Sequence, residues 1–209
     1  MSRSGTYIVI EGQDATGKST QVELLADHLR ATTTKPVITM HEPDGDLPVA
    51  HALRELTKNK AYNLEPQTHV LLFTSARLEL WKKLAEPILK SGGYVISARN
   101  WWSTLAFQGY GQGVSRSKII KITKQTMPEH YLSPDYSVIL TLDESERLAR
   151  QSSRDDNSHQ DTFESKSRNF QLAVDRAYLQ IAQDFHIDTL DSSTTIAETH
   201  TILKQKFNL

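Results

Sequence analysis

The segment from residue 12 to residue 19, GQDATGKS, has the composition and spacing of a phosphate-binding loop, G-x-x-x-x-G-K-[ST]. Glycines let successive backbone N–H groups face inward, and these donors together with the start of a helix form a nest for phosphate oxygens. Lys18 adds a positive charge near the β- and γ-phosphates, and the Ser19 hydroxyl is a ligand for Mg²⁺. A glycine turn with an incidental lysine is the structural alternative, although packing does not require Lys-Ser there. The pattern predicts a nucleoside triphosphate site formed by Gly12, Asp14, Ala15, Thr16, Gly17, Lys18, Ser19 and Thr20.

A loop of this kind does not by itself separate a kinase from a GTPase or a motor. The chain is too short for most motors, and it contains no N-K-x-D segment to read guanine. A second group of residues must therefore identify the other substrate.

Phe73 and Arg77 are four residues apart, so they share one face of a predicted helix. A ring that stacks and a guanidinium that hydrogen-bonds the polar edge of a base suit a nucleobase site. Taken alone, a phenylalanine of this kind is more often a core residue and an arginine is more often a surface residue.

Arg99 directly follows a predicted strand at Tyr94–Ser97, which places it at the edge of the sheet where ligands bind. Its planar fork of donors suits an acceptor phosphate, with a structural ion pair as the alternative. The aromatic residues Trp101, Trp102, Phe107 and Tyr110 follow within a short stretch and are expected to divide between core and pocket wall.

Arg147, Arg150 and Arg154 approximate one stripe on a helix that runs into the polar segment 155–160. This pattern favours a short lid over transferring phosphates, at about 147–163, and a solvated helix face is the alternative. The eight histidines form no H-x-x-x-H pair suited to a metal.

The elements that must position these residues alternate along the chain. Strands are expected at residues 6–10, 37–40, 94–97, 138–142 and 187–190, with helical patterns between them. The longest helical pattern spans residues 65–90, and Pro87 is expected to kink or divide it. This alternation predicts an α/β fold with a five-stranded parallel sheet, helices on both faces, and one domain over residues 1–209.

Composition excludes several classes of protein. The 209 residues carry 24 basic and 25 acidic side chains, so we expect no nucleic-acid partner bound through bulk charge. Apolar stretches are too short to span a membrane, and the first residues lack the apolar core of a secretion signal. The absence of cysteine excludes disulfides, a thiol nucleophile and a zinc knuckle.

Further segments occur in the order and spacing of one known family. After the loop come HEPDG at residues 41–45, LLFTSAR at 71–77, LAFQG at 105–109 and DTFE at 161–164. Together, from about Ile8 to Tyr178, they resemble the thymidylate kinase family of P-loop kinases, which phosphorylate dTMP. The resemblance implies the P-loop NTPase fold, the substrates ATP and dTMP, the cofactor Mg²⁺, a homodimer and a cytoplasmic location.

The resemblance also implies roles for individual residues. Phe73 would stack on thymine, Arg77 would bond the base edge, and Arg99 would bind the dTMP phosphate. Asp14 would approach the 3′-hydroxyl or order Mg²⁺, and Phe107 would crowd the 2′ position and disfavour ribose. The implied substrate site comprises Asp14, Glu42, Pro43, Phe73, Arg77, Arg99, Ser103, Thr104, Phe107 and Gln108.

One subtype of the family carries an arginine inside the loop, where this chain has Ala15. The chain therefore resembles the other subtype, which supplies arginine from the lid. The catalytic residues implied are Lys18, Arg99, Arg150 and Arg154, with Arg147 behind them, and the metal ligands implied are Ser19 and Asp14.

Three positions depart from the family pattern. The D-R-Y segment is Ala98-Arg99-Asn100, the arginine of R-E-P is His41, and the arginine of D-R-F-E is Thr162. The aspartate lost at Ala98 normally helps to organise Mg²⁺ and the phosphates, so transfer would slow by ~10²–10³-fold without compensation. The acidic residues that offer compensation are Asp44, Asp46 and Glu11.

Three functions remain open on the sequence alone. The first is dTMP phosphorylation by ATP, and the second is phosphorylation of a different nucleotide or nucleoside by the same fold. The third is a nucleotide-binding protein impaired in catalysis because Ala98 replaces the aspartate. Turnover on a panel of acceptors separates them.

Overall fold

All five predicted strands form, and they make one parallel sheet in the order β2-β3-β1-β4-β5. The computed structural model describes residues 5–45, 47–153, 163 and 166–209. The strands are β1 (Thr6–Gly12), β2 (Val37–His41), β3 (Tyr94–Ala98), β4 (Tyr136–Thr141) and β5 (Asp188–Asp191). Their bounds differ from the predicted ones by no more than two residues. The predicted α/β fold with a five-stranded parallel sheet is therefore confirmed.

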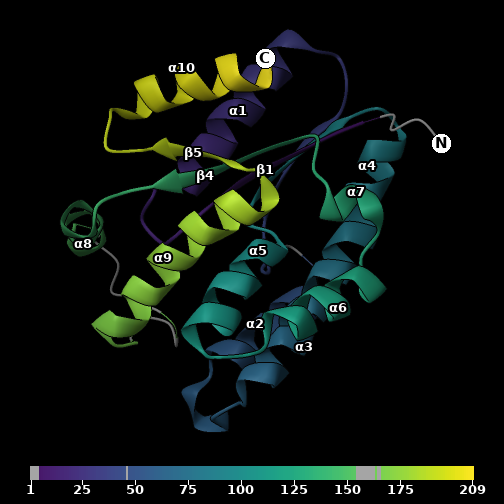
Figure 1. Cartoon of the computed structure of the whole chain (residues 1–209). Helices are drawn as coiled ribbons and strands as arrows, with labels where there is room; N and C mark the ends of the chain where they lie inside the picture. The colour runs from purple at the N-terminus through teal and green to yellow at the C-terminus, as the bar shows by residue number, and fades with distance from the viewer. Residues whose placement is uncertain (1–4, 46, 154–162, 164–165) are drawn as a thin grey trace.

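Helices cover both faces of the sheet, as Figure 1 shows. Alternating residues of β1 explain the two layers, because Ile8 and Ile10 pack on one face while Tyr7 and Val9 pack on the other. The first face carries α1 (Lys18–Thr32) and α10 (Ile196–Phe207). The helical elements of the rest of the described chain are α2 (Pro48–Lys58), η1 (Lys60–Tyr62), α3 (Pro66–Leu80), η2 (Trp81–Ala85), α4 (Glu86–Lys90), α5 (Trp101–Thr104), η3 (Leu105–Gly111), α6 (Arg116–Thr126), α7 (Glu129–Leu132), α8 (Glu144–Ser152) and α9 (Arg168–Phe185).

The long helical pattern is divided, as predicted, in the turn that precedes Pro87. Regular α3 ends at Leu80, a wider π-helical turn spans Trp81–Ala85, and α4 resumes at Glu86. The backbone hydrogen bonds of the helix continue through the wide turn, because the Glu86 amide donates to the Trp81 carbonyl. Pro87 then lies in the first turn of α4, where its missing N–H costs least.

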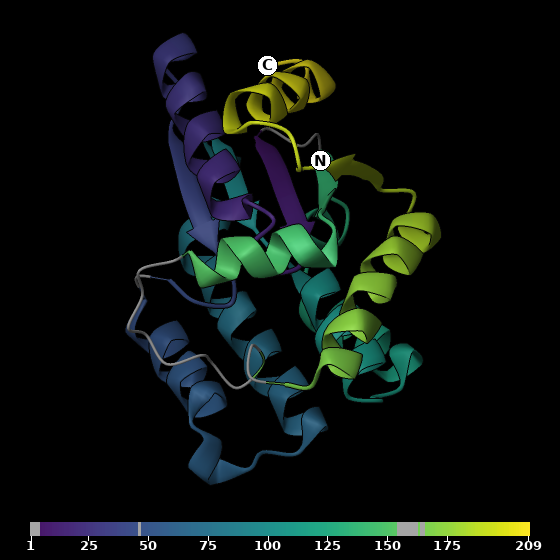
Figure 2. The ribbon, with the colours of Figure 1, turned by 90° about the vertical axis from the view of Figure 1, so that its left-hand side faces the viewer.

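The carboxyl-terminal ends of the strands lie at one edge of the sheet, and the predicted chemistry lies there. The phosphate loop follows β1, Glu42 follows β2 and Arg99 follows β3. Figure 2 shows α8, which follows β4, lying across this edge beside the start of α1. The edge is therefore the place to look for a ligand site.

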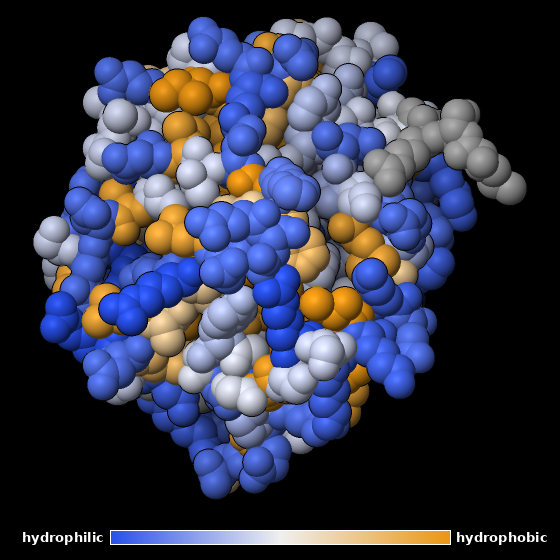
Figure 3. All heavy atoms as spheres, in the orientation of Figure 1, coloured by the Kyte–Doolittle hydropathy of each residue, from blue (hydrophilic) through white to orange (hydrophobic). Residues whose placement is uncertain are grey.

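The surface is mainly hydrophilic, with isolated apolar side chains, on the face that Figure 3 presents. Within the described ranges, every helix is too short or too polar to traverse a bilayer.

Candidate functional site

The loop between β1 and α1 has the backbone geometry of an anion nest. Gly12, Ala15 and Gly17 have φ angles of 138°, 66° and 88°, which turn successive N–H groups toward one side. A Cβ atom on Gly12 would lie 2.4 Å from the carbonyl oxygen of Leu140, so only glycine fits there. The loop lines a cavity of about 210 Å³ at the start of α1, where the helix dipole favours an anion.

Most of the predicted loop residues line that cavity, which we call the phosphate cavity; they are Asp14, Ala15, Gly17, Lys18, Ser19 and Thr20. Thr16 lines a neighbouring cavity instead, and its hydroxyl donates to the Gln13 carbonyl at 2.9 Å. Gly12 lines neither cavity, and its carbonyl accepts a hydrogen bond from Arg99 Nη1 at 3.0 Å. Lys18 Nζ also donates to the Gln13 carbonyl, at 2.6 Å, so its charge lies over the loop.

The neighbouring cavity, of about 360 Å³, lies between the phosphate loop and the connection from β5 to α10. Arg150 lines it from α8, and its Nη2 atom donates to the carbonyl of Ser192 at 2.8 Å. The same atom donates to Glu146 at 2.8 Å. The guanidinium of Arg150 thus places a positive charge beside the phosphate loop and links α8 to the β5–α10 connection.

The predicted arginine stripe is divided by the structure. Arg147 is buried and its Nη2 atom lies 3.9 Å from Asp175, so it does not share a solvent-facing stripe with Arg150. Its side chain is directed from α8 toward α9 and lines none of the three cavities described in this section, so its role as a reserve catalytic arginine stays a prediction. Arg154 lies outside the described residues, as does most of the predicted lid.

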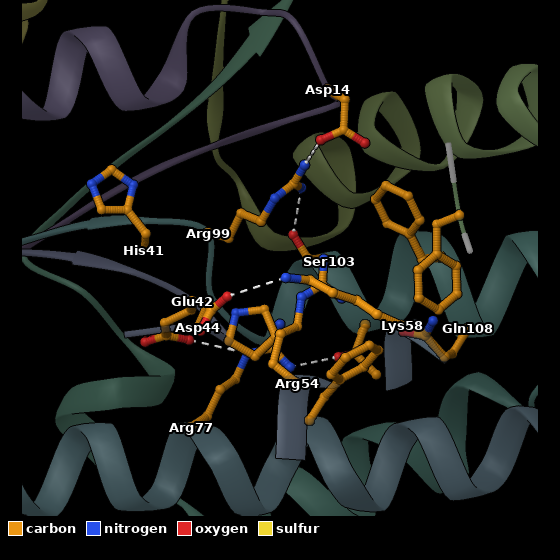
Figure 4. Close-up of a pocket in the computed structure, with 15 residues that line it drawn as sticks. Asp14, His41, Glu42, Asp44, Arg54, Lys58, Arg77, Arg99, Ser103 and Gln108 are labelled. Atoms are coloured by element: carbon orange, nitrogen blue, oxygen red, sulfur yellow. Dashed lines mark hydrogen bonds and ion pairs between the residues drawn. The ribbon is translucent and has the colours of Figure 1, made fainter. Parts of the chain in front are cut away.

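A third cavity, of about 240 Å³, contains the whole predicted substrate site. All of the predicted substrate-binding residues line this acceptor cavity, namely Asp14, Glu42, Pro43, Phe73, Arg77, Arg99, Ser103, Thr104, Phe107 and Gln108. Asp14 and Arg99 lie at its phosphate-loop end in Figure 4, and Arg77 and Gln108 come from the helices beyond. Asp14, His41, Glu42 and Arg99 also line the phosphate cavity, so the two cavities meet at these side chains.

Arg77 and Glu42 form a buried pair on the wall of the acceptor cavity. Arg77 Nε donates to Glu42 Oε2 at 3.0 Å, and Arg77 Nη1 donates to the Thr104 hydroxyl at 2.8 Å. The Tyr131 hydroxyl donates to the same Glu42 oxygen at 2.6 Å. Burial raises the pKa of Glu42 to about 7, although Arg77 and Tyr131 oppose the shift.

Arg99 lies between the two cavities in a left-handed backbone conformation, with φ at 74°. Its Nη2 atom pairs with Asp14, and its Nη1 atom donates to the Gly12 carbonyl, the Ser103 hydroxyl and the Tyr178 hydroxyl. Burial alone would raise the pKa of Asp14, but Arg99 and Lys18 hold that pKa below its usual value. The carboxylate and the guanidinium are therefore both charged at neutral pH.

The aromatic part of the acceptor cavity is built around Phe73. The His69 ring stacks against it with centroids 6.0 Å apart, and the rings of Phe163 and Phe107 complete the group. Arg54 and Arg77 each lie within 6 Å of the Phe73 ring centre. The cavity thus offers an apolar floor with cations at its margin.

The aromatic cluster after Arg99 divides between core and cavity. Phe107 lines the acceptor cavity. Trp101 and Trp102 instead pack against Phe185 in the core, and Tyr110 is partly exposed beside Arg116.

The sequence did not single out Arg54, Lys58 or Phe163, which also line the acceptor cavity. Arg54 and Lys58 are four residues apart on α2, and that spacing is the signal that could have found them.

The departures from the family pattern lie at the phosphate cavity. Ala98 and His41 both line it, and His41 Nε2 lies 3.2 Å from Glu23. Glu11 offers no compensation for the missing aspartate, because its buried carboxylate already accepts hydrogen bonds from the backbone of Gly12 and Asn100 and from Ser103. Asp44 lines only the acceptor cavity, whereas Asp46 and Thr162 lie outside the described residues.

A parallel sheet in this strand order, with a glycine-rich nest and an adjoining acceptor cavity at its carboxyl edge, defines a P-loop nucleotide kinase. A family model described as thymidylate kinase matches residues 10–202. The chain belongs to the thymidylate kinase family.

Relatives and solved structures agree with this assignment. A thymidylate kinase of Buchnera aphidicola is 36% identical over 176 residues, which cover 83% of this chain and 80% of that protein. A thymidylate kinase of Nitrosomonas europaea is 35% identical over 96% of this chain and 91% of its own. The crystal structure of the Ehrlichia chaffeensis thymidylate kinase superposes with a TM-score of 0.76 at 25% identity, over 99% of both chains. The thymidylate kinase of Candida albicans gives 0.73 at 26% identity, over 98% of this chain and 92% of its own.

Proposed function

We propose that the protein transfers the γ-phosphoryl group of ATP to the 5′-phosphate of dTMP, giving dTDP and ADP. The observation that carries the proposal is the joining of the two cavities at Asp14 and Arg99. A donor phosphate on the loop and an acceptor phosphate beside Arg99 would face each other there. Family membership supports the same reaction.

The acceptor cavity favours a base that carries a carbonyl and a ring N–H. Because the Thr104 hydroxyl accepts from Arg77 Nη1, its own hydrogen is left to donate to a carbonyl. Gln108 Nε2 donates to Gln112 at 3.3 Å, which leaves the Gln108 carbonyl to accept from a ring N–H. Thymine presents that pair of groups, whereas cytosine presents the opposite pattern. The Phe73 ring supplies a stacking surface beside them.

The chemistry is mainly positioning and charge stabilisation. The acceptor phosphate is already ionised, so no general base is required. Lys18 and Arg99 place positive charges on the donor and acceptor sides of the joined cavities, where negative charge is transferred. Arg150 and Arg154 are the further residues that we propose to be catalytic. Arg150 adds its charge from the far side of the phosphate loop.

The residues of the phosphate cavity fit a magnesium ion. The Ser19 hydroxyl and the Asp14 carboxylate both line it, and hard oxygen ligands of this kind suit Mg²⁺. These two residues would hold the ion together with oxygens of the nucleotide, since the described residues contain no cluster of three or more acidic or histidine side chains. When bound, Mg²⁺ neutralises charge on the transferred phosphoryl group.

We further propose one catalytic domain, a cytoplasmic homodimer and a lid at about residues 147–163. The dimer is supported by apolar side chains exposed on neighbouring helices, with Val49 and Leu56 on α2 and Leu71 on α3. The lid is supported by the position of Arg150 beside the phosphate loop.

The test is ADP release from ATP and Mg²⁺ with dTMP, dUMP, dCMP, dGMP, UMP or thymidine as the acceptor. Turnover that is strongest with dTMP is expected. A higher kcat/KM for another acceptor would overturn the base assignment. ATP binding without acceptor-dependent ADP release would overturn the proposed reaction.

A further inference from the structure

Tyr178 extends from α9 into the region between the phosphate loop and Arg99. Its ring is buried, and its hydroxyl makes three hydrogen bonds. Arg99 Nη1 donates to it at 3.0 Å, Ser103 Oγ lies 3.0 Å away, and the hydroxyl donates to Glu11 Oε2 at 3.1 Å.

The hydroxyls of Tyr178 and Ser103 lie between two opposite charges. Glu11 is fully buried, and its Oε2 atom is 4.0 Å from Arg99 Nη1, beyond direct hydrogen-bonding distance. Each hydroxyl bonds both the Arg99 guanidinium and the Glu11 carboxylate. Like the Tyr178 hydroxyl, Ser103 Oγ accepts from Arg99, at 3.0 Å, and it lies 2.9 Å from Glu11 Oε2. The guanidinium therefore approaches the carboxylate through the hydroxyls and keeps Nη2 directed to Asp14.

We propose that Tyr178 is a positioning residue, whose hydroxyl, with that of Ser103, prevents Arg99 from closing onto Glu11 and keeps the guanidinium available to the acceptor phosphate. The proposal rests on the proposed function, in which Arg99 binds that phosphate. Its physical basis is the low dielectric of the buried site, where a direct ion pair is much stronger than one separated by hydroxyls. Without the spacer, the guanidinium turns toward Glu11, and the acceptor phosphate must compete with a buried carboxylate.

The test compares ligands with and without the phosphate. Titration calorimetry measures the binding of dTMP and of thymidine to the full chain and to Tyr178→Phe. We expect the dissociation constant for dTMP to rise about tenfold, because Arg99 is drawn away from the phosphate. The constant for thymidine should stay within twofold, because the base pocket is unchanged. The KM for ATP should also stay within twofold.

Controls separate positioning from folding. Tyr136→Phe removes a tyrosine hydroxyl on β4, where the ring packs against Phe207 away from both cavities, and should change neither constant. Ser103→Ala removes the second hydroxyl and should weaken dTMP binding in the same direction. The double variant, Tyr178→Phe with Ser103→Ala, should weaken dTMP binding by more than either single change. The measurement on Ser103→Ala still tests the proposal if Tyr178→Phe is unstable.

Two results would overturn the proposal. One is an equal loss of thymidine and dTMP affinity, which would indicate a general disturbance of the pocket. The other is unchanged dTMP affinity in Tyr178→Phe and in Ser103→Ala. A wild-type protein that binds dTMP no more tightly than thymidine would instead contradict the phosphate role of Arg99 in the proposed function.

Discussion

Arg77 Nε lies 3.0 Å from Glu42 Oε2, and the two side chains are only 3% and 0% exposed. The pair joins α3 to the segment after β2, and Tyr131 adds a hydrogen bond from α7. Removing one partner of such a pair leaves a buried charge without compensation. Arg77, the arginine predicted to bond the base edge, is therefore fixed by a network whose own charge state depends on pH.

The stability of the wild type relative to Glu42→Gln should fall as pH rises from about 5 to 8. Burial raises the pKa of Glu42 to about 7 from 4.5, so the folded state holds a proton that the unfolded state has released over this range. The relative loss is about 3 kcal/mol if the whole shift is expressed. Urea unfolding at several pH values measures it. Asp27→Asn, which removes an exposed carboxylate on α1, is the control, and a difference independent of pH would contradict the shift.

Lys18→Ala should reduce kcat by ~10³-fold or more, because Lys18 is the lysine of the phosphate loop and lines the phosphate cavity. ADP release with dTMP is the measurement, and Lys121→Ala, an exposed lysine on α6, should behave as wild type. Turnover retained in Lys18→Ala with an unchanged melting temperature would contradict the role of the phosphate loop.

Arg150→Ala should raise the KM for ATP by about tenfold and leave the KM for dTMP unchanged. Arg150 lines the cavity behind the phosphate loop and is remote from the acceptor cavity lining, so its loss concerns the donor side. Arg30→Ala removes an exposed arginine of α1 and serves as the control. If Arg150→Ala changed only the KM for dTMP, the assignment of Arg150 to the donor side would be incorrect.

Phe107→Ala should relax discrimination against ribose. Phe107 lines the acceptor cavity with Arg99 5.5 Å from its ring centre, where it would crowd a 2′-hydroxyl. The ratio of kcat/KM for dTMP to that for the ribonucleotide 5-methyl-UMP should fall about tenfold. Phe107→Tyr keeps the ring and should keep the ratio; equal ratios in all three proteins would place the discrimination elsewhere.

Ala98→Asp should raise kcat at saturating Mg²⁺ by about tenfold or more, because it supplies a carboxylate at the phosphate cavity. The same change should lower the melting temperature, since Ala98 is buried among apolar neighbours such as Ile10. Ala98→Asn adds similar bulk without charge and should give only the loss of stability. An unchanged kcat in Ala98→Asp would mean that the carboxylate is already compensated.

Local sequence patterns were sufficient to predict the sheet. The runs at Val37–His41 and Tyr94–Ala98 are short and β-branched, and both are strands within one residue of the expected bounds. The π-helical turn at Trp81–Ala85 could not be predicted in the same way. Hydrophobic spacing does not distinguish an extra residue in one turn from a regular helix. Pro87 indicated an irregularity one turn before it, where the wide turn lies, but not its form.

The set of residues that line the acceptor cavity, from Asp14 to Gln108, was predicted through the resemblance to the family. The topology explains why they meet, because parallel strands place their carboxyl ends at one edge. What spacing could not give is the orientation of side chains on one helix. Arg147 and Arg150 lie one turn apart, yet the first is buried and the second lines a cavity. Likewise, the hydroxyl of Tyr178 meets Arg99 across 79 positions, a contact that only tertiary packing creates.

The left-handed backbone at Arg99 has a consequence for laboratory evolution. An arginine in this conformation costs roughly 1–2 kcal/mol relative to glycine, and its φ of 74° is held by the contacts of its own guanidinium. Glycine at position 99 would remove that backbone cost but would leave the carboxylates of Asp14 and Glu11 without their cation, which costs more. A variant library sorted only for heat resistance would therefore retain arginine at this position.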